Sequence, residues 1–244
     1  NPNYFDSNNR LIIDSGTIGF TNDVLGNNPT ISPTAEDLKS IRSIEERRVR
    51  LTENNLIFAT SINFFKTTNI SLKDNNFYSV RVKVESAGNL LSLFANASKS
   101  LKNQNEANSI FDVEFSQYFK TELEYIKHWD FKSQRIVAIR AFGGIAIPYG
   151  NSKSIPFSRS YFSGGSNDKR AWQPYSLGPG SSGGINDFNE ANLKIGFSAE
   201  LRFNLFGKLN GAIFSDVGNI WNVLDNVNNQ ASTFNGFKSL KDIA

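Results

Sequence analysis

Residues 111–129 read FDVEFSQYFKTELEYIKHW and alternate with a period of two. The odd positions, from Phe111 to Trp129, are mostly aromatic or aliphatic, while the even positions are mostly charged or polar. This alternation predicts a β-strand with one apolar and one polar face. At about 3.3 Å per residue the strand would extend for about 60 Å, which is more than a tilted strand needs to cross a bilayer. Water-soluble sheets rarely contain such strands.

The same alternation recurs along the chain. Residues 78–85 place valines between charged residues, and residues 192–205 form the most regular stretch, with Leu, Ile and Phe at the odd positions. Weaker strands are predicted at about 10–20, 41–65, 134–147 and 209–221. The sequence therefore predicts about seven strands, with an eighth beginning near Phe237.

The connections between these strands alternate in length. Short links are predicted at 66–76, 129–133 and 206–208, and long polar connections at 21–40, 95–108, 150–190 and 222–235. Short turns at one end and long loops at the other are typical of outer-membrane β-barrels. We therefore predict an all-β fold, a transmembrane antiparallel β-barrel of which this chain forms a portion.

The composition of the chain excludes several other classes of protein. The 244 residues include no cysteine and one histidine, so neither a disulfide framework nor a metal site is expected. A net charge of +3 is close to balanced for this length, so the protein is not expected to bind nucleic acid. No uncharged apolar run reaches the roughly 18 residues of a membrane-spanning helix, and no secretory leader opens the sequence.

Residues 1–244 are interpreted as one barrel domain that is incomplete at both ends. An open, odd-numbered set of lipid-facing strands would leave backbone groups without hydrogen-bond partners inside a bilayer. We therefore expect further strands outside this sequence.

The connection at 150–190 is too long for a hairpin turn. Within it, residues 155–188 read IPFSRSYFSGGSNDKRAWQPYSLGPGSSGGINDF, with glycine pairs that allow tight backbone paths and with several aromatic side chains. Connections of this length are usually functional or disordered. The aromatic residues favour a loop that packs against the protein.

Three motifs in this half of the chain resemble the BamA/TamA superfamily. Phe162-Ser163-Gly164-Gly165, followed by Lys169-Arg170-Ala171-Trp172, resembles the superfamily's sixth extracellular loop, in which a GG turn precedes a [VI]-R-G-[FY] tetrad. Phe214-Ser215-Asp216-Val217-Gly218 is similar to its F-x-D-x-G strand motif. Glu200 lies where the superfamily places an acidic partner. The resemblance covers roughly residues 134–244 and is closest to proteins of the Bacteroidota.

Two positions depart from the superfamily pattern. Lys169 replaces the apolar Val or Ile of the tetrad, and Ala171 with Trp172 replaces Gly-[FY]. Arg170 is retained.

The resemblance implies a sixteen-stranded barrel in a bacterial outer membrane, preceded by periplasmic POTRA domains that this chain does not include. The chain would run from about the seventh strand to the start of the fourteenth. The implied activity is insertion or translocation of proteins, without catalysis and without a cofactor. The implied partners are unfolded outer-membrane or exported proteins, outer-membrane lipids, and periplasmic or lipoprotein accessory subunits.

The alternation also predicts where the motif residues point. Glu200 falls on the polar face of its strand, and Phe214, Asp216 and Gly218 share one face of the next strand. If the loop folds into the lumen, the planar guanidinium of Arg170 can hydrogen-bond both carboxylates. The absence of a side chain at Gly218 would let the loop backbone approach the wall.

Two other classes of function remain open at this stage. One is a passive outer-membrane pore, in which the long loop constricts the channel. The other, more remote, is a barrel-borne hydrolase that uses Glu200 and Asp216 as paired catalytic carboxylates.

Overall fold

The computed structural model describes residues 55–71, 74–97, 109–110, 113–182, 189–225 and 230–243. All of these residues belong to one compact unit, Asn54–Ile185 with Asn189–Ala244. The strand predicted at 10–20, the loop at 21–40, and most of the strand at 41–65 and of the loop at 95–108 lie outside the described residues.

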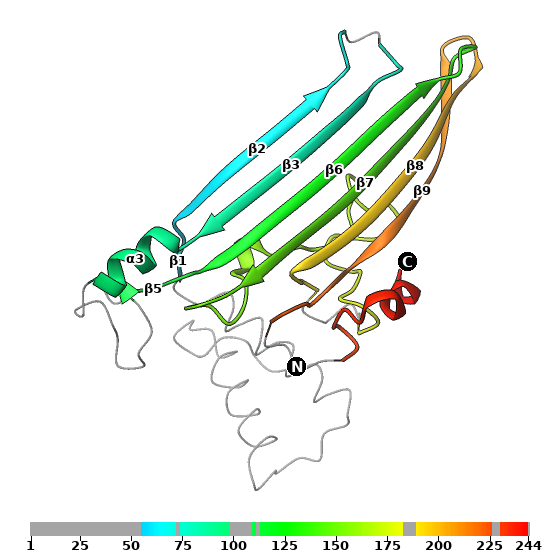
Figure 1. The fold of residues 1–244 in the computed structure, drawn as a ribbon. Coiled ribbons are helices and arrows are strands. Elements are labelled where there is room, and N and C mark those ends of the chain that lie inside the picture. The colour runs from blue at the N-terminus through cyan, green and yellow to red at the C-terminus, as the bar shows by residue number, and fades with distance from the viewer. Residues whose placement is uncertain are drawn as a thin grey trace, which may run out of the picture. The chain divides into compact units, whose positions relative to one another are not determined.

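A six-stranded antiparallel sheet forms most of the described unit (Figure 1). Its strands follow each other in chain order, so each one pairs with the next: β2 (Ala59–Thr67), β3 (Tyr78–Ala87), β6 (Tyr118–Asp130), β7 (Arg135–Pro148), β8 (Leu193–Phe206) and β9 (Leu209–Trp221). This is the up-and-down order of outer-membrane barrels, and it confirms the predicted all-β antiparallel fold. Within the described residues the sheet is open, with β2 and β9 at its edges.

The sheet exposes its apolar face and covers its polar face. We call the exposed side the outer face; its large apolar side chains include Ile62, Phe64, Leu123, Tyr125, Trp129, Phe197, Leu201, Leu205, Ile213 and Val217. The opposite, inner face carries the charged residues, and Glu85, Lys120 and the Asp216 side chain are buried there. This is the reverse of a water-soluble sheet and is typical of a strand layer whose outer side meets lipid.

The connections alternate in length as predicted. Residues 68–77, 131–134 and 207–208 link β2 to β3, β6 to β7 and β8 to β9 at one end of the sheet, while the long connections lie at the other end (Figure 1). Among the described residues, no helix is both long and apolar enough to cross a membrane.

The strand predicted at 111–129 is interrupted. Val113–Phe115 forms β5, which belongs to a separate small sheet with β1 (Asn55–Leu56) and β4 (Ser109–Ile110), and the long strand begins only at Tyr118. The break lies at Ser116 and Gln117, whose backbone N–H groups donate to the Leu56 carbonyl at 3.0 Å and to the Ser152 hydroxyl at 2.8 Å. These partners come from other segments, so alternation alone could not reveal the break.

Two further elements differ from the prediction. The helix α3 (Asn89–Ala97) lies between the strand predicted at 78–85 and the long connection predicted at 95–108, and it overlaps the start of that connection. The eighth strand predicted near Phe237 is wrong: the 3-10 helix η3 (Gly236–Asp242) lies there. The Ser239 hydroxyl accepts the backbone N–H of Asn235, and the Asp242 carbonyl accepts a hydrogen bond from the Asn219 amide. These contacts between side chains and backbone take the place of the backbone hydrogen bonds that a strand would form with a neighbouring strand.

A small apolar core lies where the long β7–β8 connection meets the sheet. Its buried members are Ala87, Tyr118, Ala146, Ile155, Tyr161, Ala191 and Ile220, from four strands and both ends of the connection. The core therefore joins the loop to the wall at the end of the sheet that carries the long connections.

Candidate functional site

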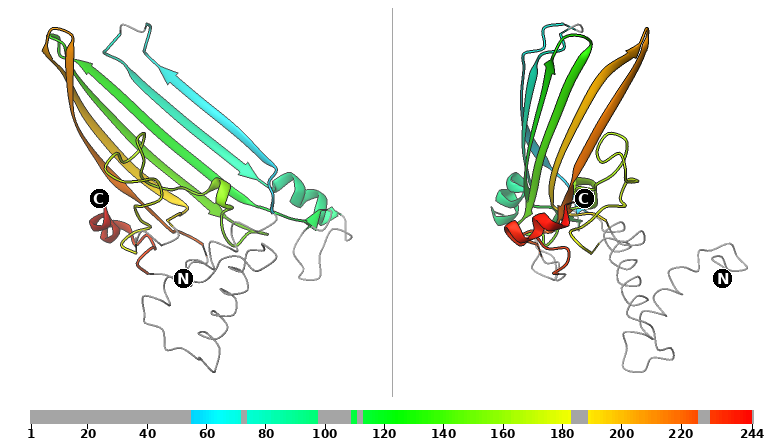
Figure 2. Two further views of the ribbon diagram at one scale, coloured as in Figure 1. Left: turned by 180° about the vertical axis from the view of Figure 1, so that it is seen from behind. Right: turned by 90° about the vertical axis from the view of Figure 1, so that its right-hand side faces the viewer.

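The described parts of the connection between β7 and β8, residues 149–182 and 189–192, fold back onto the inner face of the sheet (Figure 2). After the short 3-10 helix η2 (Phe157–Arg159), Tyr161 forms an isolated antiparallel bridge with Ala191, with N···O distances of 2.8 and 2.9 Å. The bridge closes the base of the loop. Residues 162–175, which we call the loop tip, extend from this base over β7, β8 and β9.

Two glycines make the turn that shapes the loop tip. Gly164 and Gly165 have φ values of +106° and +103°, which residues with a side chain rarely adopt. A Cβ atom on Gly164 would lie 2.1 Å from the carbonyl oxygen of Gln173. The N–H of Gly165 donates to the Trp172 carbonyl at 2.8 Å, so the GG turn closes the tip into a compact hairpin-like loop.

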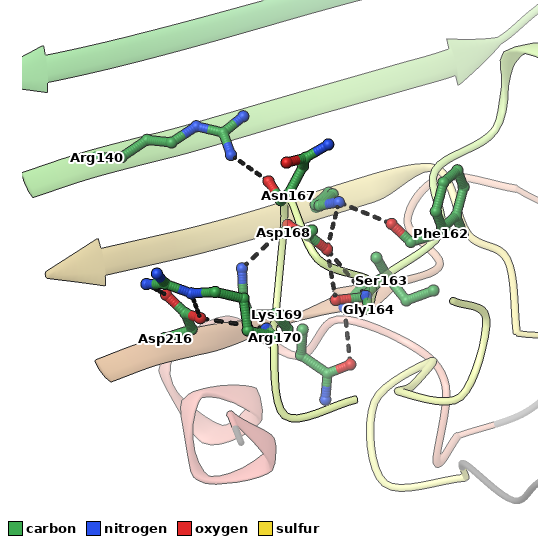
Figure 3. A network of polar contacts seen from close by, with 12 residues as sticks. Arg140, Phe162, Ser163, Gly164, Asn167, Asp168, Lys169, Arg170 and Asp216 are labelled. Carbon is green, nitrogen blue, oxygen red and sulfur yellow. Dashed lines mark hydrogen bonds and ion pairs between the residues drawn. The ribbon is translucent and has the colours of Figure 1, made fainter. Parts of the chain in front are cut away.

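Arg170 projects from the loop tip onto β8 and β9 (Figure 3). Its Nε and Nη2 donate to the two carboxylate oxygens of Asp216 at 2.7 and 2.8 Å, and its Nη1 donates to Glu200 at 2.7 Å. Its backbone N–H also reaches Asp216, at 3.2 Å. The fork binds Asp216 in the bidentate geometry that suits a guanidinium. We call this set of hydrogen bonds the arginine contact.

The surroundings of the arginine contact strengthen it. The side chain of Asp216 is 4% exposed and that of Arg170 is 27% exposed, so water screens the pair only partly. The guanidinium carbon of Arg170 lies 3.7 Å from the ring centroid of Phe214, a cation–π contact. The hydrogen bonds to Asp216 and Glu200 outweigh desolvation and raise the pKa of Arg170 above its ordinary value. Arg170 therefore stays charged at any pH at which the protein is folded.

Glu200 joins the loop to a second cation on the wall. Its Oε2 accepts from Arg170, and its Oε1 accepts from Arg202 at 2.6 Å, on the same strand. Since the two oxygens of Asp216 also accept from Arg170, every oxygen of the two carboxylates has a guanidinium partner.

A second set of charged contacts fixes the other side of the loop tip. Lys194 on β8 donates to the carboxylate of Asp168 at 2.9 Å and to the Phe162 carbonyl at 2.8 Å. Arg140 on β7 donates to the carbonyl of Asn167 at 2.8 Å, as Figure 3 shows. Together with the arginine contact, these bonds tie the tip to three adjacent strands. The pattern of the sequence identified none of these partners, although Arg140 and Lys194 fall on polar-face positions of their strands.

Lys169, which replaces an apolar residue of the superfamily pattern, is buried. It is 2% exposed, and its ammonium has an ion pair with Asp168 at 3.3 Å. Its side chain lies over the paired glycines Gly196 and Gly218: added Cβ atoms there would lie 2.6 Å from Lys169 Nζ and 2.5 Å from Lys169 Cε. The lysine thus uses its methylene chain for packing that a Val or Ile would supply.

The remaining motif residues contribute in different ways. Phe162 stacks on Tyr175, with ring centroids 4.3 Å apart. The side chain of Trp172 is 41% exposed, and this residue acts through its backbone, which closes the GG turn. In the part of the chain that the structure describes, no group of His, Cys, Asp and Glu side chains is arranged to hold a metal ion.

The contact between Asp168 and Lys194 is expected to weaken in acid. Burial alone would raise the pKa of Asp168, but hydrogen bonds from Lys194 and the Gly164 N–H hold the pKa below its ordinary value of 3.8. The stabilisation is therefore complete above about pH 4 and is lost as the pH falls through the lower folded-state pKa. We expect Asp168→Asn to cost about 1.5 kcal/mol at pH 7.

Urea unfolding in detergent micelles at pH 7 and at pH 3 measures this contribution. The difference between the wild type and Asp168→Asn should shrink at the lower pH, and Lys194→Gln should remove most of that pH dependence. An equal difference at both pH values would contradict the assigned contact.

An antiparallel sheet with an apolar outer face, and a long loop held on its polar inner face, is the arrangement expected for a portion of an outer-membrane β-barrel. The sequence pattern of the Omp85 superfamily domain matches residues 92–242, which is more than half of the chain. The chain belongs to the Omp85 superfamily, and this confirms the resemblance to BamA and TamA proteins that the motifs indicated. The comparison with curated proteins found no match.

Proteins of the Omp85 superfamily reside in outer membranes, where they insert or translocate other proteins, and they are generally not enzymes. Their substrates are outer-membrane or exported proteins.

Proposed function

We propose that this chain is the part of an outer-membrane insertion or translocation barrel in which the lumen loop holds the wall opposite the site of substrate entry. The observation that carries the proposal is the arginine contact. A single loop side chain hydrogen-bonds carboxylates on two neighbouring strands, β8 and β9. Lys194 adds a further contact on β8, and Arg140 extends the attachment to a third strand, β7.

The physical role of the loop follows from what an insertion barrel must withstand. A barrel that admits a substrate strand by β-augmentation has to open one strand pair, and opening leaves backbone groups unpaired. Charged contacts between the loop tip and β7, β8 and β9 resist separation of those strands. The opening would then be confined to a strand pair elsewhere in the barrel.

This proposal includes the domain organisation. Residues 1–244 form part of a sixteen-stranded barrel, in a protein that also carries POTRA domains. Its partners are unfolded outer-membrane or exported proteins, lipids of the outer membrane, and periplasmic or lipoprotein subunits.

Depletion of the protein in its host tests the function. We expect other β-barrel proteins to lose their heat-modifiable, folded form in the outer membrane, or exported proteins to accumulate in the periplasm, within a few generations. Restoration by the wild-type gene, and weaker restoration by an Arg170→Ala variant, would support the proposal. Normal assembly and export after complete depletion would overturn it.

A passive pore predicts a different set of results. The purified protein would show stable single-channel conductance with solute selectivity, and its depletion would leave barrel assembly and export intact. The hydrolase alternative predicts a hydrolytic activity that Glu200→Gln abolishes. General acid catalysis needs a carboxyl group that is free to hold a proton, whereas Glu200 and Asp216 accept hydrogen bonds from guanidinium groups at each oxygen.

A further inference from the structure

The helix α3 carries no charged residue. Its sequence is NLLSLFANA, and it follows β3 after a turn at Gly88, which has a φ of +76°. Leu90 and Leu93, three residues apart and therefore on one side of the helix, are 49% and 68% exposed. An uncharged surface helix that exposes leucines is unusual in a protein region that faces only water.

The helix begins on the outer face of the sheet. The amide of Asn89 donates to the hydroxyl of Ser86 at 2.7 Å and accepts from the hydroxyl of Tyr149 at 2.6 Å. Ser86 is paired with Phe119, an exposed aromatic residue of the outer face. In Figure 2, α3 and the β7–β8 loop lie on opposite sides of the sheet.

The helix also lies at the end of the sheet that carries the long connections (Figure 1). In outer-membrane barrels that end faces the outside of the cell, so the apolar band of the outer face ends near this level. The leucines of α3 are thus exposed on a helix that begins beside Phe119 of the outer face.

We propose that α3 is an interfacial helix that lies in the headgroup region of the outer leaflet, with Leu90 and Leu93 directed into the acyl chains. The occupant of this surface is lipid, because the helix begins beside the lipid-facing side of the sheet and contains no charge that would select a protein partner. This inference rests on the proposed function only through its location in the outer membrane. The helix would hold the β3–β6 end of the wall at a defined depth.

Fluorescence quenching in lipid nanodiscs tests the depth of α3. These 244 residues contain no cysteine, so a single cysteine introduced here is the only one in this part of the protein. A bimane probe is attached at Leu93→Cys, at Ile213→Cys on the outer face of β9, and at Lys153→Cys, an exposed position of the β7–β8 connection. The nanodiscs contain phosphatidylcholine with nitroxide lipids, spin-labelled near the headgroup or near the chain end, and iodide serves as the aqueous quencher.

The probe at 93 should be quenched most by the nitroxide near the headgroup, the probe at 213 most by the deeper nitroxide, and the probe at 153 by iodide alone. If the probe at 93 behaves like that at 153, or is protected from both quenchers by protein, the proposal of an interfacial helix is overturned. Quenching of the probe at 213 by the lipid nitroxides would in that case still support a membrane-spanning sheet. Iodide quenching at 213 would instead overturn the membrane-spanning sheet itself.

Discussion

Replacing Arg170 with alanine is expected to release the loop tip from the inner face and to lower the stability of the folded protein by about 2–4 kcal/mol. The substitution removes the guanidinium partner of both Asp216 oxygens and of Glu200 Oε2. The buried carboxylate of Asp216 would keep its charge without that partner, and this is the main cost. This expected loss of stability is smaller than that for a fully buried ion pair, because the side chain of Arg170 is 27% exposed.

Trypsin provides a direct measurement, because the loop tip contains a cleavage site at Lys169, which is 2% exposed in the folded protein. The wild type should resist cleavage at this residue, whereas Arg170→Ala should be cut there and should show its folded gel band only to a lower temperature. Arg170→Lys should fall between the two, since an ammonium keeps the charge but lacks the planar fork.

Arg202→Ala is the matched control. It removes a cation from Glu200 but leaves the loop attached, because Arg202 lies on the same strand as its partner. We expect this variant to resist trypsin at Lys169 as the wild type does. Equal protection in Arg170→Ala and Arg202→Ala would rule out the arginine contact as the attachment of the loop.

The strands were predictable because their signal is local. A period of two places residues on opposite sides of a strand whatever lies nearby, so 78–85 and 192–205 could be assigned, with faces, from the sequence alone. The interruption at Ser116 and Gln117 and the 3-10 helix near Phe237 depend on side chains from distant segments. No local pattern carries that information.

The candidate site was predictable in part because short motifs resemble those of a known superfamily. The motifs singled out Arg170, Glu200 and Asp216, and the structure brings these three together. The attachments through Lys194 and Arg140 were missed, since a charged residue on a polar strand face looks the same whether it contacts a loop or water. The packing of Lys169 was missed because a lysine in a loop is usually solvated.

Replacing Gly218 with alanine is expected to have the other large effect. An added Cβ would lie 2.4 Å from the backbone oxygen of Ile195 and 2.5 Å from Cε of Lys169. The Ile195 oxygen belongs to the adjacent strand and cannot move without disturbing the pairing of β8 with β9. We expect a loss of about 3 kcal/mol and exposure of Lys169 to trypsin.

Two other glycines turn this expectation into a graded series. Gly143 on β7 has open space where a Cβ would be added, so Gly143→Ala should change neither stability nor trypsin resistance. At Gly196 the Cβ would meet only the flexible end of Lys169, at 2.6 Å, so Gly196→Ala should lower the stability less than Gly218→Ala.

Shortening the lysine in a Lys169→Ala, Gly196→Ala double variant should relieve that clash, because the obstructing atom is gone. The same Lys169→Ala change should not restore the stability of Gly218→Ala, because the clash with the strand backbone persists. If Lys169→Ala restored the stability of both glycine variants, the wall would tolerate a side chain at 218, and the close approach of the loop to β9 would not depend on this glycine.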